Sequence, residues 1–234
     1  MRIHSGVGVG LLLGLLQTSA LGQSSTAPAA AAGLPERLAA LQQTLAQNRK
    51  TLQGYQWVET RAVSYKGEVK STTKSSCSYG PDGTVQRVQL SVVPPEETKG
   101  GGFAERKRQE IRNTVKAALG LVKSYVPLDP ALIQKCQDTG KASMSVLASG
   151  KLLRLVFRDY KLPGDILTLT LDGPTSKLTQ MTVSSYVDAS TPVSLDVRMG
   201  SLADGTGYAE DIQLAIQSKD VTVGVTNSDY KPKS

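Results

Sequence analysis

The sequence of 234 residues has almost no histidine and little cysteine, and these shortages exclude several classes of catalytic and metal-binding site. Its single histidine, His4, lies in an N-terminal stretch that is typical of a cleaved signal peptide. The remaining chain therefore lacks the base of Ser-His-Asp and Cys-His catalysis and the ligands of histidine-rich zinc sites. Two cysteines cannot form a four-cysteine zinc site, so we expect a non-enzymatic protein with no metal and no cofactor.

Aromatic residues other than tyrosine are also scarce, with two phenylalanines and one tryptophan in the chain. The sequence contains no aromatic and basic motif of the known nucleic-acid modules, so nucleic acid is not an expected partner. The net charge of +7 favours anionic partners such as lipid headgroups or an anionic membrane surface. The sequence carries no signal for an oligomeric state.

Long hydrophobic runs are absent beyond the N-terminus. The apolar run over residues 7–16 is shorter than the roughly 20 residues that span a bilayer. It follows a basic start and precedes small residues, which predicts a signal peptide over residues 1–22. Residues 23–33 are low in complexity and predict a linker, and residues 34–234 fit one domain. We therefore expect an exported protein, in the periplasm or otherwise secreted.

The two cysteines, Cys77 and Cys136, fit export to an oxidising compartment, where a disulfide between them is the expected state. In the chain-entropy model a loop of this length would stabilise the fold by about 4 kcal/mol. Free thiols are the alternative, because the sequence does not show whether the two side chains meet.

Two amphipathic helices are expected. The first, over residues 35–53, has leucines at helical spacing, a proline in its first turn and a glycine after its end. The second, over residues 104–126, has an apolar stripe opposite a basic face. We interpret this basic face as solvated, with contact to an anionic membrane as the alternative. A short helix over residues 129–137 is expected to follow.

Most of the remaining chain alternates between apolar and polar residues, as in a sheet with one buried face. Asp-Gly pairs at 82–83, 172–173 and 204–205 each separate two alternating runs, which is typical of hairpin turns. A sheet this wide must curl or be covered, and the helices are the available cover. The sequence therefore predicts an α+β fold: a strongly curved antiparallel sheet, an open half-barrel, covered on its concave side by two amphipathic helices.

Two patterns with catalytic associations have simpler explanations. Ser71-Thr-Thr-Lys74 matches the S-x-x-K motif of penicillin-recognising enzymes, but it falls in an expected strand and the chain has no Lys-Thr-Gly. Asp159, Asp165 and Asp172 would be the carboxylates of a hydrolase. Each of them lies at a strand end or turn, where aspartate is favoured for turn geometry.

The order of elements resembles the lipoprotein-carrier superfamily of the LolA and LolB type. An N-terminal helix is followed by strands containing "YQWVETRAVSYKGEV" and "YGPDGTVQRV", and the chain later runs through hairpins to "VTVGVTNSDY". The resemblance implies an open half-barrel whose cavity shelters acyl chains of a lipid or lipoprotein. Because no cysteine for lipid attachment is present, the chain looks like the soluble carrier, with Arg61 as the candidate ligand-binding arginine.

We thus expect an exported protein that binds an apolar or acylated ligand between sheet and helices. The alternative is a filled-core envelope protein that binds a protein or glycan through its outer surface. Trp57 has two interpretations, a wall of the ligand cavity or an anchor of the core. The expected apolar lining is Trp57, Leu155, Phe157, Leu167, Leu169, Val183, Leu195, Val197 and Leu214, and the expected headgroup contacts are Arg61, Arg106, Arg108 and Arg112.

Overall fold

The computed structural model describes residues 33–93, 102–126, 128–147 and 150–233. The predicted signal peptide and nearly all of the predicted linker lie outside the described residues, so both stay predictions. None of the helices in the described ranges is both long and apolar enough to cross a lipid bilayer.

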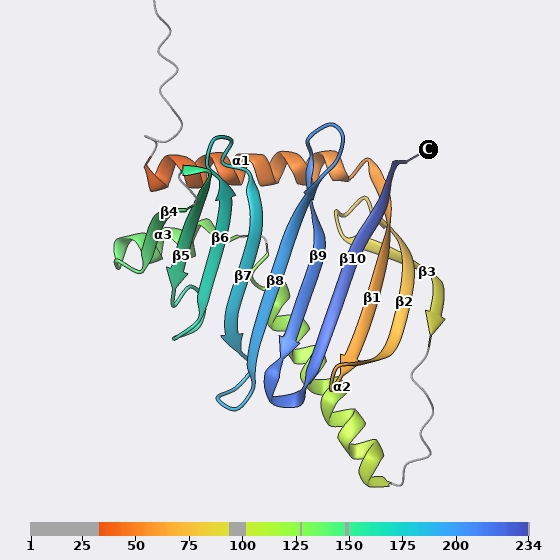
Figure 1. Cartoon of the computed structure of the whole chain (residues 1–234). Helices are drawn as coiled ribbons and strands as arrows, with labels where there is room; N and C mark the ends of the chain where they lie inside the picture. Colours follow the sequence, from red (N-terminus) through yellow and green to blue (C-terminus); the bar gives the residue numbers. More distant parts are fainter. Residues whose placement is uncertain (1–32, 94–101, 127, 148–149, 234) are drawn as a thin grey trace, which may run out of the picture.

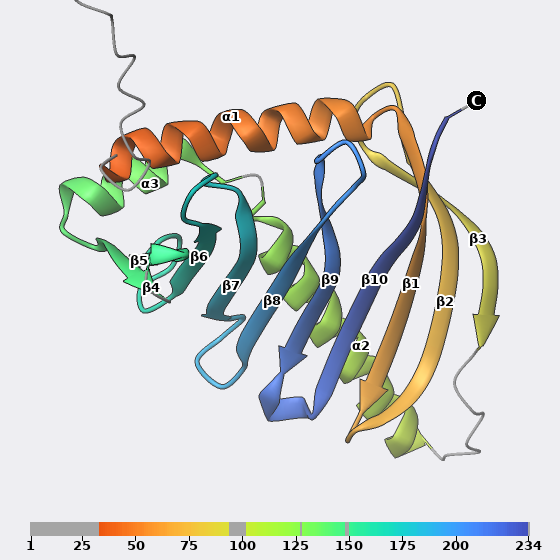
Figure 2. The ribbon, with the colours of Figure 1, turned by 45° about the horizontal axis from the view of Figure 1, so that its top comes forward.

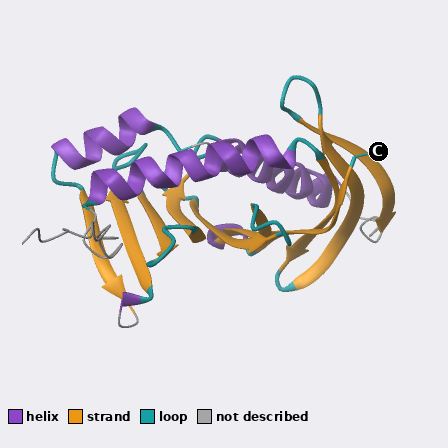
Figure 3. Ribbon diagram, turned by 90° about the horizontal axis from the view of Figure 1, so that it is seen from above, coloured by secondary structure: helices purple, strands orange, loops and turns teal. Residues whose placement is uncertain are grey.

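Ten antiparallel strands form one open sheet, in the order β3-β2-β1-β10-β9-β8-β7-β6-β5-β4 (Figure 1). The edge strands β3 and β4 each have a neighbour on one side only, so the bent sheet does not close into a barrel (Figures 2 and 3). The predicted α+β class with a curved antiparallel sheet is confirmed. The strands are β1 Tyr55–Tyr65, β2 Glu68–Tyr79, β3 Val85–Val93, β4 Ala142–Leu147, β5 Leu152–Arg158, β6 Ile166–Asp172, β7 Leu178–Tyr186, β8 Pro192–Ser201, β9 Gly207–Ile216 and β10 Val221–Pro232.

All three Asp-Gly pairs lie in hairpin connections, as predicted, between β2 and β3, β6 and β7, and β8 and β9. Gly205 has a φ of 81°, a left-handed conformation that glycine adopts without strain. Asp204 accepts a hydrogen bond from the backbone N–H of Thr206 at 2.8 Å, which fixes the turn. The local chemistry of each turn therefore determines which strands become neighbours.

In the described residues, three α-helices accompany the sheet: α1 Leu34–Leu52, α2 Gly102–Lys123 and α3 Pro130–Asp138. α1 lies along one end of the strands and α2 crosses behind the sheet in this view (Figure 1). The predicted bounds of α1 and α3 are right to within one residue. The second predicted helix, residues 104–126, ends three residues early, at Lys123, and a turn follows.

The main core lies where the inward-facing residues of β5 to β10 meet the three helices. Alternate residues of β6 are buried, as the period of two in a strand requires. Leu38 and Leu41 of α1, Ala118 of α2 and Ile133 of α3 join the same cluster. The expectation of two covering helices is therefore incomplete, because α3 also contributes to the core.

The strands β1 to β3 have a different character from the rest of the sheet. Eight of the nine residues of β3 are exposed and the first, Val85, is half-buried, whereas alternate residues of β5 and β6 are buried. The exposed side chains of β3 include Val88 and Leu90, which are apolar. This end of the sheet therefore presents surfaces that no other described residue covers.

Candidate functional site

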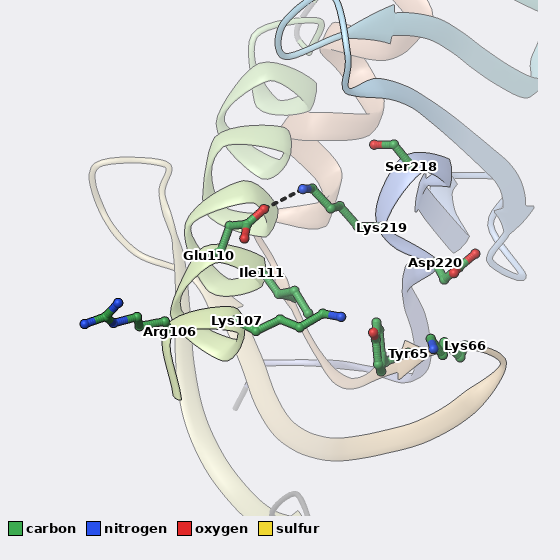
Figure 4. A pocket seen from close by; sticks show the side chains of 9 residues that line it. All are labelled: Tyr65, Lys66, Arg106, Lys107, Glu110, Ile111, Ser218, Lys219 and Asp220. Atoms are coloured by element: carbon green, nitrogen blue, oxygen red, sulfur yellow. Dashed lines mark hydrogen bonds and ion pairs between the residues drawn. The ribbon is translucent and has the colours of Figure 1, made fainter. Parts of the chain in front are cut away.

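A cavity of about 570 Å³ lies between the N-terminal half of α2 and the adjacent ends of β1 and β10 (Figure 4). Its size is within the range of about 300–1,000 Å³ that is usual for ligand sites. Four cationic, two acidic and three further side chains surround it. The lining residues are Tyr65, Lys66, Arg106, Lys107, Glu110, Ile111, Ser218, Lys219 and Asp220.

Two tight turns and one face of a helix bring these residues together. The turn after β1 places Lys66 at a φ of 53°, and the short 3-10 helix η3, Gln217–Lys219, is followed by Asp220 at a φ of 52°. The backbone N–H of Lys66 donates to the carbonyl of Asp220 at 2.8 Å, so the two turns hold each other. Lys107 and Ile111 are one helical turn apart and therefore share a face of α2.

An ion pair connects the two walls of the cavity. Lys219 Nζ lies 2.5 Å from Glu110 Oε1, between η3 and α2. Hydrogen bonding to Lys219 lowers the pKa of Glu110, and the same contact raises the pKa of Lys219. Both side chains are substantially exposed, so solvent screens the pair and it is only a weak tether.

The cavity has apolar as well as charged walls. Tyr65 and Ile111 pack against the main core. Tyr65 also pairs with Val221 in the ladder between β1 and β10, and Val221 is buried. The cavity therefore stands directly beside the apolar interior of the protein.

Only one of the four predicted headgroup arginines lines this cavity. Arg106 does so, yet its guanidinium group points away from the other lining side chains (Figure 4). Arg108 and Arg112 both pair with Glu105 on α2, at 3.3 and 2.5 Å. Contact of these arginines with a headgroup stays a prediction. Three lysines of the lining were not among the predicted site residues: Lys66, Lys107 and Lys219. Only Lys66, in a Lys-Gly turn, carried a sequence signal.

Arg61, the remaining candidate, belongs to a charged group on β1 to β3. The carboxylate of Glu59, whose side chain is 7% exposed, accepts hydrogen bonds from Arg61 Nη2 at 2.7 Å and Arg87 Nη2 at 2.9 Å. Arg87 Nε also donates to Glu59, so that the contact is bidentate. Both arginines stay about 40% exposed. Glu59 and Arg61 are only two residues apart on β1, but Arg87 is 28 residues away from Glu59, so the complete group was not predictable from the sequence.

Eight of the nine predicted lining residues lie together in the main core, packed with the three helices. Their role as a ligand lining stays a prediction, since each is buried in this closed arrangement. They are Leu155, Phe157, Leu167, Leu169, Val183, Leu195, Val197 and Leu214.

Trp57 lies apart from this cluster and is 6% exposed. Its Nε1–H donates to Asn227 Oδ1 at 3.0 Å, and its ring stacks on Tyr230 with 5.5 Å between centroids. Tyr79 packs against the same indole at 5.3 Å. Of the two interpretations, these contacts favour the core anchor.

The predicted disulfide is wrong, because both cysteines are free and buried. Cys77 is in β2, whereas Cys136 is in α3, which packs on β4 and β5 near the other end of the sheet. At about 4.8 Å per strand the separation along the sheet is roughly 35 Å. A disulfide needs Cα atoms within about 7 Å. Burial raises the pKa of both thiols, so neither is activated for reaction.

The three aspartates considered for a hydrolase do not form one cluster. Asp165 is fully buried and accepts hydrogen bonds from Tyr125 and from backbone N–H groups, whereas Asp172 caps the turn at the far end of β6. At about 3.3 Å per residue, the two are roughly 20 Å apart. Asp159 pairs with Lys141 at 2.8 Å. Each carboxylate thus has a local structural partner.

A second, smaller site lies on the opposite face of the sheet, over β8, β9 and β10. It has a volume of about 380 Å³ and includes Arg198, which pairs with Asp211. Gly224 contributes to it by lacking a side chain, and a Cβ added there would meet open space. Arg198 and Thr226 both bond to Asp211, and Asp196 accepts a hydrogen bond from Gln180, so each charged group of this site already has a partner.

No protein-family model and no curated protein matches the sequence. Among solved structures, the chain is similar to a DUF1329 family protein from Desulfovibrio piger, with a TM-score of 0.37 and 12% identity over 84% of this chain and 92% of that one. It is also similar to a LolA superfamily protein from Nitrosomonas europaea, with a TM-score of 0.33 and 9% identity over 83% and 94%.

The structural neighbours thus include the superfamily that the order of elements resembles. A further neighbour is a chain of the MucA/MucB complex of Pseudomonas aeruginosa, with a TM-score of 0.21 and 12% identity over 82% of this chain and 98% of that one. At these TM-scores the likenesses do not support an inference about a ligand or partner, which must come from the residues of this chain.

Proposed function

We propose that this is an exported, non-enzymatic protein that binds an apolar or acylated ligand between α2 and the inner face of the sheet. The observation that supports this proposal is the position of the cavity beside α2. Its apolar walls, Tyr65 and Ile111, continue into the main core, and its rim is cationic. A cavity with a charged rim and apolar walls suits an amphiphile, which has both a polar headgroup and an apolar chain.

In this proposal the helices cover the concave face of the half-barrel, and α2 moves to admit the ligand. The two ends of α2 are held unequally. After its C-terminal end, Tyr125 bonds to buried Asp165 at 2.5 Å, whereas its N-terminal half is largely exposed and tied by the Glu110–Lys219 pair. Tilting of α2 about Tyr125 would expose the eight core residues as a lining. Each methylene buried there stabilises the complex by about 0.8 kcal/mol.

The direct test is native mass spectrometry of protein exported to the periplasm and purified without detergent. We expect a bound lipid or acyl chain at near-stoichiometric level. The same protein, after removal of lipid, should take up a fluorescent fatty-acid probe. Clean protein that also takes up no probe would contradict the proposal.

A pair of variants on α2 tests where the chain enters. Ile111→Glu places a charge on the apolar wall of the cavity, and we expect at least tenfold weaker probe uptake because the charge must be desolvated. Asn113→Glu introduces the same charge at an exposed position of the same helix and should bind like wild type. Equal uptake by the two variants would place the entrance elsewhere.

The second candidate function is binding of a protein partner through the free edge of β3. It corresponds to the alternative of an envelope protein with a filled core that binds its partner through the outer surface. The exposed valines and leucine of β3 border unpaired backbone groups, an arrangement that accepts an added strand. A lysine at Leu90 should abolish such pairing and leave probe uptake unchanged. Loss of probe uptake in Leu90→Lys would show that the edge of β3 and the ligand cavity are not independent sites.

A further inference from the structure

The charges facing the cavity beside α2 come from three segments that are distant in sequence. Lys107 extends from α2 toward Tyr65 and Lys66, and Lys219 approaches from η3 (Figure 4). The described residues place no carboxylate within 4 Å of the amino groups of Lys66 or Lys107. Lys66 Nζ lies over the ring of Tyr65, 5.6 Å from its centroid. Two ammonium groups without a carboxylate partner therefore border the same space.

The two acidic residues of the lining do not cancel this charge. Glu110 is bound by Lys219 at 2.5 Å, so that the pair is neutral as a unit. The carboxylate of Asp220 points away from Lys107 (Figure 4). The remaining positive charge lies on Lys66 and Lys107, with Lys219 close by on the other wall.

The cations of the lining are suited to phosphate. Lysine binds phosphate as a compact point charge, whereas the planar fork of arginine forms bidentate contacts with carboxylate or phosphate. The one arginine of the lining, Arg106, points outward, and the inward-facing cations are lysines (Figure 4). Ser218 adds a hydroxyl group that can donate to a phosphate oxygen.

We propose that this cavity binds a phosphate group, carried by the headgroup of an anionic amphiphile whose chain enters past Tyr65 and Ile111. The entry of the chain rests on the proposed function, and the phosphate site does not. The volume of about 570 Å³ exceeds that of a phosphate and leaves room for the rest of the headgroup. Glu110 stays compatible with a bound anion as long as Lys219 neutralises it.

Isothermal titration of the delipidated protein with three probes separates the sources of phosphate. Dihexanoyl phosphatidic acid carries both a phosphate and chains, dihexanoylglycerol carries the same chains without phosphate, and inorganic phosphate has no chains. We expect phosphatidic acid to bind at least tenfold more tightly than dihexanoylglycerol. We expect inorganic phosphate to compete with it, and the competition to weaken as salt rises.

Single-charge variants then assign the site. Lys107→Gln should weaken binding of phosphatidic acid about tenfold, the usual scale of one lost charged hydrogen bond, and Lys66→Gln should add to the loss. Lys116→Gln is the matched control, because Lys116 is an exposed lysine of the same helix outside the cavity. Equal binding by Lys107→Gln and Lys116→Gln would overturn the phosphate site.

The three probes also keep the two proposals apart. Equal affinity for dihexanoylglycerol and phosphatidic acid would overturn the phosphate site and leave amphiphile binding standing. Binding of inorganic phosphate that depends on Lys107, with no binding of either amphiphile, would support the site and overturn the proposed function. Binding of none of the three probes would overturn both.

Discussion

Replacement of Tyr125 by phenylalanine is expected to destabilise the protein by about 2–3 kcal/mol, because it removes one hydroxyl group from a fully buried cluster. That hydroxyl donates to Asp165 Oδ2 at 2.5 Å and lies 3.0 Å from Ser185 Oγ. A hydrogen bond to a charged group contributes about 1.5–3 kcal/mol, and the buried serine also loses a partner. Asp165 keeps backbone donors, among them Leu162 at 2.9 Å, which limits the loss.

Urea denaturation measures this change. With a slope of about 2 kcal/mol per molar urea, the midpoint of Tyr125→Phe should fall by roughly 1 M while the slope stays constant. Tyr186→Phe is the matched control, since the Tyr186 hydroxyl donates to the carbonyl of Pro163 at 2.9 Å in an exposed position. We expect a change below about 0.5 kcal/mol there. Equal midpoints for the two variants would refute the reasoning.

The pH dependence provides a second readout. Burial, with the hydrogen bond to Asp165, raises the pKa of Tyr125 above its ordinary value near 10. The native protein therefore holds this proton where the unfolded chain releases it, so the stabilisation is complete below pH 10 and declines above it. The stability gap between wild type and Tyr125→Phe should narrow by up to about 1.4 kcal/mol per pH unit above pH 10. A gap that stays constant to pH 11 would contradict the assignment.

Three further predictions concern the rest of the fold. The thiols of Cys77 and Cys136 should react with Ellman's reagent only after the protein is unfolded. If neither thiol reacts in protein that is unfolded without a reducing agent, the two cysteines form a disulfide after all. Gly224→Ala should leave the stability unchanged or raise it by up to about 0.5 kcal/mol, because the new Cβ meets open space. Gly200→Ala should destabilise the protein by about 1 kcal/mol, because its Cβ would lie 2.7 Å from the ring of Tyr208. Similar melting temperatures for the two variants would refute this contrast. Glu59→Gln should lower the free energy of unfolding by about 1–2 kcal/mol in urea, and no loss would show that its two arginines need no charged partner.

The fold class was predictable because the hydrophobic period of each strand or helix is visible within that segment of the sequence. Val193, Leu195 and Val197 alternate with polar residues in the sequence, and all three are buried in the structure. The helical stripe that includes Ile111 and Ala118 likewise faces the core. Burial of one face is a property of each segment, so it can be read before any contact between segments is known.

The candidate site was predictable only in part, because its members meet through the topology. Lys107 was one of many basic residues on α2, and nothing in the sequence distinguished it from Lys116. Lys219 acquires its role by pairing with Glu110, a residue far away along the chain. Arg61 was a candidate by resemblance, but the approach of Arg87 to the same carboxylate, that of Glu59, depends on the register between β1, β2 and β3.

By itself, the sequence determined the periods, the turns and the sign of the charge, and these specify a curved antiparallel sheet with amphipathic helices. Only the tertiary structure decided that the two cysteines stay apart and that three lysines from separate segments share one cavity. The physical reason is that periodicity and turn chemistry act over a few residues. Pairing of thiols or charges depends on distances between segments, which the sheet order sets.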